Sequence, residues 1–288
     1  MDQRLEGLLQ LLELERLEVN IFRGASRDIG SPQVYGGQVL GQALQAAYAT
    51  VDAERVVHSL HAYFLRRGDF NAPIVYFVDR SRDGHSFTSR RVTAIQHGEQ
   101  IFNCSASFQV PETGLEHQLG MPDVPPPEAL PESLLPGSEF LEGLSPRLRQ
   151  FMHERPIEFR AVPAAVTATI AGTHRQYLWI RTVDRLPDDD RLHQCLLAYA
   201  SDFHLLGTAL VRHRHSIARG KLVLASIDHA MWFHRKVRMD DWLLYAADSP
   251  SASGARGFTR GSLYSRYGVL VASTTQEGLI RVLPPEGS

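Results

Sequence analysis

The stretch LVLASIDHAMWFHRKV, residues Leu222–Val237, gathers a serine, an acid and two histidines among apolar residues. These are the residue types of a Ser-His-Asp centre and, in part, of a metal site. A catalytic triad is disfavoured because the chain has no G-x-S-x-G turn. In addition, Ser226 and His229 point to opposite faces of a continuous strand, on which Ser226 shares its face with Asp228. We therefore expect no covalent serine nucleophile here.

A metal site is disfavoured for similar reasons. His229 and His234 lie on opposite faces of the same expected strand. The chain contains no H-E-x-x-H and no C-x-x-C pattern. Its two cysteines, Cys104 and Cys195, are too few for a disulfide framework or a four-cysteine zinc site. We expect no metal, and we interpret both cysteines as buried reduced thiols.

Three short polar residues in the second half stand in apolar segments. Asp202 lies in LLAYASDFHLLG, Ser226 in LVLASIDHAMWF and Gln276 in VLVASTTQEGLI. A carboxylate inside a buried helix is unfavourable unless it is hydrogen-bonded or functional. If the three residues converge, they can hold one water molecule, with the carboxylate accepting its proton and the hydroxyl and amide fixing its position. This pattern favours general-base hydrolysis without a covalent intermediate.

The elements that must position these residues occur twice in the same order. Helical periodicity covers Leu5–Glu18, and Gly36–Val51 has small and apolar residues on nearly every face, as in a buried helix. Alternating patterns and turn residues then predict strands at Val56–Leu65, Pro73–Arg82, Ser86–Gln96 and Glu99–Val110.

The second half repeats this order after a proline-rich segment. A capped, buried helix is expected within Pro187–Leu210. Strands are expected at Ile157–Val162, Arg175–Val183, Leu222–Val237, Asp241–Ser249, Ala255–Ser265 and Gly268–Val282. HAYF at His61–Phe64 also matches HAMW at His229–Trp232. We predict an α+β duplication with an N-terminal unit at 1–110, a proline-rich linker at 111–150 and a C-terminal unit at 151–288 that carries the catalytic residues.

Nearly the whole chain resembles the bacterial acyl-CoA thioesterase II family. The matching stretches are QVYGGQVLGQALQAA, VHSLHAYFLRRGD, DGHSFTSRRVTAIQ, ASFQ, PDDDRLHQCLLAYASD, IDHAMWFHR, DWLLYAADSPSASGARGFTRG and VLVASTTQEG. The resemblance implies a double hotdog fold, in which two units, each a long helix wrapped by an antiparallel sheet, are fused in one chain. It also implies hydrolysis of acyl-CoA thioesters, here expected to be medium- to long-chain, to fatty acid and CoA, with no cofactor.

The resemblance also implies the catalytic residues. The water-holding residues of the family correspond to Asp202, Ser226 and Gln276, where serine stands in place of the usual threonine. Serine keeps the hydroxyl, so we expect activity to be retained. The first half has no acid that matches Asp202, which predicts one hydrolytic centre per chain. Backbone amides at a helix start, near Gly36–Gln38 or within the second unit, are candidate oxyanion donors, and the sequence does not select between them.

The phosphates of CoA require basic groups, and no spacing selects among the arginines. The candidates are Arg66, Arg67, Arg90, Arg91, Arg256 and Arg260. Two other functions stay open. A hotdog hydratase needs an Asp-His pair on the binding helix, and His204 points away from Asp202 there. A non-hydrolytic acyl-CoA-binding protein would bind the substrate without releasing thiol.

Composition excludes other classes of protein. A net charge of −2 argues against a nucleic-acid binder. No apolar run is long enough to span a membrane, and the acidic, periodic N-terminus is unlike a signal peptide, so we expect a cytoplasmic protein. Hotdog units commonly pair their sheets, which covers edges and apolar surface. We therefore expect a homodimer or homotetramer.

Overall fold

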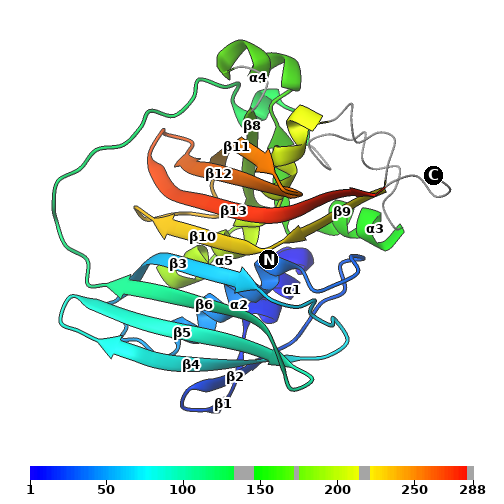
Figure 1. Ribbon diagram of the computed structural model, residues 1–288. Helices are drawn as coiled ribbons and strands as arrows, with labels where there is room; N and C mark the ends of the chain where they lie inside the picture. The colour runs from blue at the N-terminus through cyan, green and yellow to red at the C-terminus, as the bar shows by residue number, and fades with distance from the viewer. Residues whose placement is uncertain (133–145, 172–174, 214–220, 284–288) are drawn as a thin grey trace.

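Helices and a large antiparallel sheet build the fold (Figure 1). The computed structural model describes residues 1–132, 146–171, 175–213 and 221–283. The helices are α1 (Gln3–Leu12), α2 (Gly36–Tyr48), α3 (Pro146–Glu154), α4 (Ala164–Ala171) and α5 (Asp190–Ser201), with 3-10 helices η1 (Pro127–Ala129) and η3 (Leu206–His213). The strands are β1 (Glu15–Glu18), β2 (Ile21–Gly24), β3 (Val56–Phe64), β4 (Ile74–Asp83), β5 (Phe87–Gln96), β6 (Glu99–Gln109), β7 (Ile157–Ala161), β8 (Arg175–Thr182), β9 (Lys221–Ser226), β10 (Asp228–Phe233), β11 (Leu243–Ser253), β12 (Arg256–Ser265) and β13 (Leu270–Leu283).

The strands form one sheet of 13 strands in the order β1-β2-β4-β5-β6-β3-β10-β13-β12-β11-β8-β7, with β9 also paired to β13. In this order, the strands of the first half of the chain lie together at one end of the sheet, and those of the second half lie together at the other end. They meet where β3 pairs antiparallel with β10, and His61 lies opposite Ala230 at this junction. The repeated HAYF and HAMW segments are therefore neighbours in space. The α+β fold class predicted from the sequence is confirmed.

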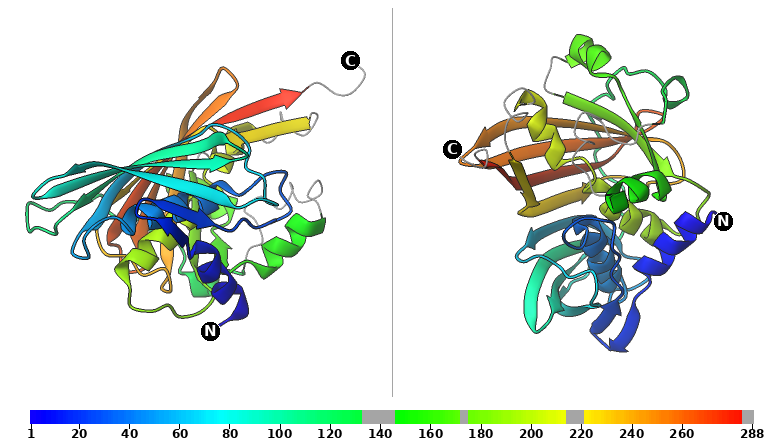
Figure 2. Two further views of the ribbon diagram at one scale, coloured as in Figure 1. Left: turned by 90° about the horizontal axis from the view of Figure 1, so that it is seen from below. Right: turned by 90° about the vertical axis from the view of Figure 1, so that its right-hand side faces the viewer.

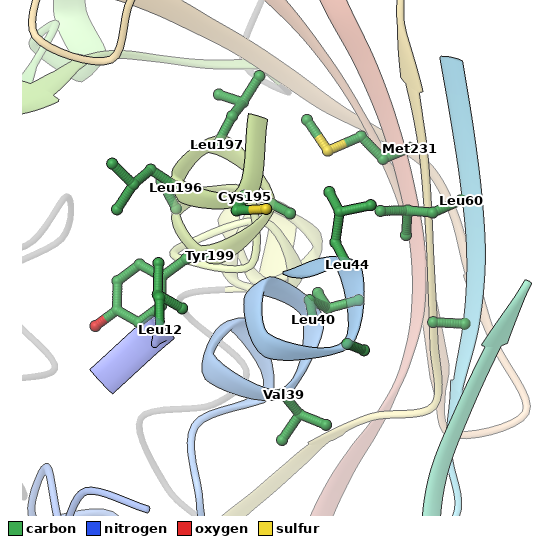
Figure 3. Packing of buried hydrophobic residues seen from close by; sticks show 14 of the residues in the cluster. Leu12, Val39, Leu40, Leu44, Leu60, Cys195, Leu196, Leu197, Tyr199 and Met231 are labelled. Carbon is green, nitrogen blue, oxygen red and sulfur yellow. The ribbon is translucent and has the colours of Figure 1, made fainter. Parts of the chain in front are cut away.

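The two helices expected to be buried form the centre of the core. Figure 2 shows the sheet as a curved layer with the helices gathered on one side of it. Leu44 of α2 points toward Leu60 of β3 and Met231 of β10, whereas Leu196 points to the other side of α5; all four belong to one buried core cluster (Figure 3). This burial of apolar side chains is the main favourable term in folding. Within the described ranges, no helix is long and apolar enough to cross a membrane.

The first helix is shorter than its sequence predicted. Its apolar stripe runs through Leu5, Leu8 and Leu12, and α1 ends there, with Glu13 in an extended conformation. The next position of the stripe is Glu15, which cannot pack on the core. Residues 15–18 instead form the strand β1, in which all four residues are exposed. The expected helix Leu5–Glu18 was therefore wrong in its last turns.

The connection between the halves is extended at first. Residues 111–126 carry no helix or strand. Gln118 fastens this segment to the opposite half of the sheet by donating to the Gly268 carbonyl at 2.8 Å and accepting from the Leu270 N–H at 3.1 Å. Residues 133–145 of the predicted linker lie outside the described residues, and α3 begins within its last part.

Candidate active site

Asp202 lies where helix α5 ends. It closes the helix after Ser201 with φ −80° and ψ −15°, so it is the C-cap and not the interior helical residue that was predicted. The apolar run that suggested a longer helix continues into η3, after a turn in which His204 has a φ of 64°. The Asp202 side chain is only 7% exposed. Burial raises its pKa above the ordinary value, and the negative end of the helix dipole acts in the same direction.

The start of α2, from the other half of the chain, opposes that effect. The Gly37 N–H donates a hydrogen bond to the Asp202 carboxylate, which lowers its pKa. Both glycines are needed for this close approach. A Cβ at Gly36 would lie 2.7 Å from Asp202 Oδ2, and one at Gly37 would lie 2.2 Å from the Tyr199 carbonyl oxygen. The Gly-Gly pair thus lets the positive end of α2 meet the end of α5.

Gln276 and Ser226 complete the predicted trio. Gln276 is fully buried on β13, and its Nε2 donates to Asp202 Oδ1 at 2.6 Å and to Ser226 Oγ at 3.1 Å. The Ser226 hydroxyl is also hydrogen-bonded to Asp202, and both bonds lower the carboxyl pKa. Gln276 Oε1 is buried with no hydrogen-bond partner among the described residues. The structure brings all three residues together around one carboxylate.

The segment expected as a single strand is in fact two strands. β9 ends at Ser226 and β10 begins at Asp228, while the Ile227 N–H between them bonds to the Glu277 carbonyl at 2.9 Å. This break resets the alternation of side chains. Ser226 and His229 both face the site, whereas Asp228 turns away and accepts the Glu277 N–H at 2.6 Å. The prediction that Ser226 shares its face with Asp228 was wrong for this reason.

His229 lies behind the trio and is fully buried. Its Nε2 is 2.9 Å from Ser201 Oγ, and that hydroxyl donates to the Ala198 carbonyl at 2.9 Å. Since a hydroxyl has one proton, the imidazole must donate from Nε2 and keep Nδ1 as an acceptor. Nδ1 faces Gln276 Nε2 at 3.4 Å and lies 3.9 Å from Asp202 Oδ1. Burial lowers the pKa of His229 to about 3, so the ring is neutral.

No pattern in the sequence indicated this contact of His229. The segment was interpreted as an unbroken strand, which placed His229 on the face away from Ser226. Its apolar neighbours were the available signal, because a histidine among them must find a polar partner once it is buried. That partner, Ser201, precedes Asp202 directly in the chain.

Two tyrosines hold the end of α5 in place. The last carbonyls of a helix have no partner within the helix. Here the Tyr35 hydroxyl donates to the Tyr199 carbonyl and the Tyr245 hydroxyl to the Ser201 carbonyl, each at 2.9 Å. These bonds fix the helix end directly before Asp202.

A cavity of about 250 Å³ opens beside the trio. Ser226 from the second half and Gly36 and Val39 of α2 from the first half line it, together with Phe64 and Phe102. One wall therefore carries a residue of the trio, and much of the remainder is apolar.

Other residues considered from the sequence lie elsewhere. His234 lies 2.9 Å from the hydroxyl of Ser273 on a neighbouring strand. Cys104 and Cys195 are buried free thiols, as predicted. Over the part of the chain that the structure describes, no three His, Cys, Asp or Glu side chains are grouped as a metal site needs.

Comparison with known proteins places this site in a family. Residues 24–109 match the family described as acyl-CoA thioesterase N-terminal domain, and residues 148–279 match the one described as acyl-CoA thioesterase. Acyl-CoA thioesterase 2 of Haemophilus influenzae is 43% identical over 285 residues, which cover 98% of this chain and 99% of that protein. The chain belongs to the acyl-CoA thioesterase II family.

Other relatives of this thioesterase family member support the same family and fold. Human acyl-coenzyme A thioesterase 8 is 40% identical, with 95% of this chain and 88% of that protein covered. The crystal structure of acyl-CoA thioesterase II TesB2 from Mycobacterium marinum has a TM-score of 0.83 and 46% identity, and covers 98% of this chain and 100% of that one. A protein with a hot dog fold from Alicyclobacillus acidocaldarius, at 20% identity and a TM-score of 0.76, supports the fold alone. The predicted double hotdog fold is confirmed.

Proposed function

We propose that this protein hydrolyses medium- to long-chain acyl-CoA to fatty acid and CoA through a water molecule held by Asp202, Ser226 and Gln276. The observation that carries the proposal is a single buried carboxylate, bonded to a hydroxyl and an amide at the wall of a cavity. Membership of the family supplies the reaction class. The geometry supports the assignment of the three roles.

In the proposed reaction, Asp202 acts as the general base. Its carboxylate accepts a proton from water while the water oxygen attacks the thioester carbonyl carbon. The tetrahedral intermediate then collapses and the C–S bond breaks. The proton held by Asp202 passes to the departing sulfur, so the products are a carboxylic acid and the CoA thiol. Ser226 and Gln276 position the water and support the ionised form of the base.

The carbonyl oxygen gains charge during attack and needs a donor. Of the three amides expected from the sequence, Gly37 N–H is bonded to Asp202 and Gln38 N–H lies 3.1 Å from the Tyr35 carbonyl. Gly36 lines the cavity at the positive end of α2. We assign its amide as the oxyanion donor, because the other two are already engaged.

The hydratase alternative is not favoured by the surroundings of His229. This ring approaches Asp202, as a hydratase pair would, but it is fully buried. Both of its nitrogens face protein atoms, Ser201 on one side and Gln276 on the other. A general acid must reach the substrate, and this imidazole does not.

The remaining properties expected from the sequence are proposals too. We infer a cytoplasmic homodimer or homotetramer that binds neither nucleic acid nor membrane and needs no cofactor. Two buried free thiols suit a reducing compartment. The division into units 1–110 and 151–288 joined by a linker at 111–150 also stays a prediction. Light scattering on the purified protein tests the assembly.

The decisive test of function is thiol release from a series of acyl-CoA substrates. Asp202→Asn keeps the volume but removes the base, so turnover should fall roughly 10²–10⁴-fold. Asp228→Asn is the matched control, because Asp228 stands near the trio in sequence but faces away from it. A well-folded Asp202→Asn protein with normal turnover would move the base elsewhere. Tight acyl-CoA binding without any thiol release would support the non-hydrolytic alternative instead.

A further inference from the structure

The cavity beside Ser226 is apolar in its wall and cationic at its opening. Arg66 and Arg67 lie just beyond the end of β3, after Leu65, and both line the cavity that contains Ser226. Both are exposed to solvent. A ligand that enters with a reactive thioester at Ser226 therefore extends toward two guanidinium groups.

The two arginines differ in their partners. Arg66 pairs with Glu99 at 2.9 Å and donates to the Gln100 carbonyl at 2.7 Å. The nearby acid Asp69 is hydrogen-bonded to His97 at 3.0 Å. Among the described residues, no acid pairs with Arg67 and no carbonyl accepts from it. Its positive charge is thus available to a ligand.

The other arginines considered from the sequence have structural roles or stand apart from the trio. Arg90 is buried and bonds to Thr50 at 2.9 Å. Arg256 pairs with Glu277 at 3.0 Å and Arg260 with Asp248 at 2.9 Å. Arg91 is exposed on β5 and does not line this cavity.

We propose that the cavity beside Ser226 takes the CoA part of the substrate and that Arg67 binds a CoA phosphate, with Arg66 beside it. This inference rests on the proposed hydrolysis. A guanidinium fork suits phosphate oxygens. The dimethyl carbon of the pantetheine arm suits the apolar wall of Val39, Phe64 and Phe102.

The test compares three thioesters of one fatty acid: acyl-CoA, its 3′-dephospho form, and acyl-pantetheine, which has no phosphate. Arg67→Ala should raise KM for acyl-CoA roughly fivefold with little change in kcat, as expected for one lost solvent-exposed ion pair. KM for acyl-pantetheine should not change. If the 3′-dephospho substrate loses the effect, Arg67 binds the 3′-phosphate; if it keeps the effect, Arg67 binds the pyrophosphate.

The matched control is Arg91→Ala, which removes an exposed arginine outside the cavity and should leave all three KM values unchanged. An unchanged KM for acyl-CoA in Arg67→Ala, or an equal rise with acyl-pantetheine, would overturn the inference. A rise in KM that Arg67→Ala shows only with an acyl-pantetheine whose acyl chain ends in a carboxylate would also overturn the inference. Arg67 would then face the end of the acyl chain and not a CoA phosphate. Failure of the unaltered protein to hydrolyse any of the thioesters contradicts the proposed function itself and is therefore distinguishable.

Discussion

The ionisation of Asp202 is set by opposing influences from two helices and two strands. Burial and the end of α5 raise its pKa, while bonds from Gln276, Gly37 and Ser226 lower it. A base must be ionised yet still hold the proton it takes from water, so a pKa above that of an ordinary aspartate suits this role. The same three donors hold one rotamer of the carboxylate.

His229 links the hydrogen bonds around Asp202 to Ser201, because its ring lies between Gln276 and the Ser201 hydroxyl. Ser201→Ala removes the acceptor of the Nε2–H and so releases the ring from its tautomer. The alternative tautomer places a proton on Nδ1, against the Gln276 amide. We expect kcat to fall roughly tenfold, the effect of one mispaired buried hydrogen bond, while KM is unchanged.

The control for this change is Ser107→Ala, which removes the serine partner of His58 in the first half of the chain. Ser107→Ala removes a histidine–serine hydrogen bond that lies away from the trio, so kcat should not change. Steady-state kinetics on both variants decide the question. Equal losses in the two variants would mean that the His229–Ser201 pair contributes only general stability.

The approach of α2 to α5 is the critical contact between elements. Gly37→Ala places a Cβ 2.2 Å from the Tyr199 carbonyl oxygen, which is backbone and cannot rotate away. The helices must separate, at a cost of roughly 1–3 kcal/mol in the free energy of unfolding. The Gly37 bond to Asp202 weakens at the same time, so we expect turnover to fall as well. Denaturant unfolding and thiol release measure the two effects.

Gly207→Ala is the control for Gly37→Ala, because a Cβ at Gly207 meets no atom within 4 Å. It lies in η3, close in sequence to Asp202, and should leave stability and turnover nearly unchanged. A Gly37→Ala protein as stable and active as this control would show that the two helices can move apart without consequence.

The stability of the whole molecule should depend on pH through His229. Its pKa is about 3 in the folded protein and near 6.5 when unfolded. Between these values the unfolded state binds the proton and the folded state does not. Stability from this group is therefore fully present above pH 6.5 and is lost as the pH falls toward 3.

The prediction is tested by urea unfolding at several pH values between 7 and 4. The unaltered protein should lose free energy of unfolding more steeply than His229→Gln, which cannot take up the proton. Parallel slopes for the two proteins would mean that His229 becomes charged without unfolding the core. The comparison isolates His229 because the remaining titratable groups are common to both proteins.

The sequence by itself determined the α+β class, the repeated order of elements and the three residues Asp202, Ser226 and Gln276. The physical reason is that burial penalties leave a visible pattern. Helical and alternating apolar periods follow from which faces are buried, and short polar residues inside those runs need a reason to be there. The pattern singled out Asp202, Ser226 and Gln276, and the family resemblance implied that they act together.

The tertiary structure alone decided how the trio is supported. Where a helix or strand ends depends on the residues that pack against it in the folded protein. Only the tertiary structure could therefore show that Asp202 caps α5 and that the strand breaks at Ile227. The break turns His229 toward the site. The donor Gly37 and the cation Arg67 come from the other half of the chain, far from Asp202 in sequence. Local periodicity carries no information about such distant contacts, because they form only when the two halves pack.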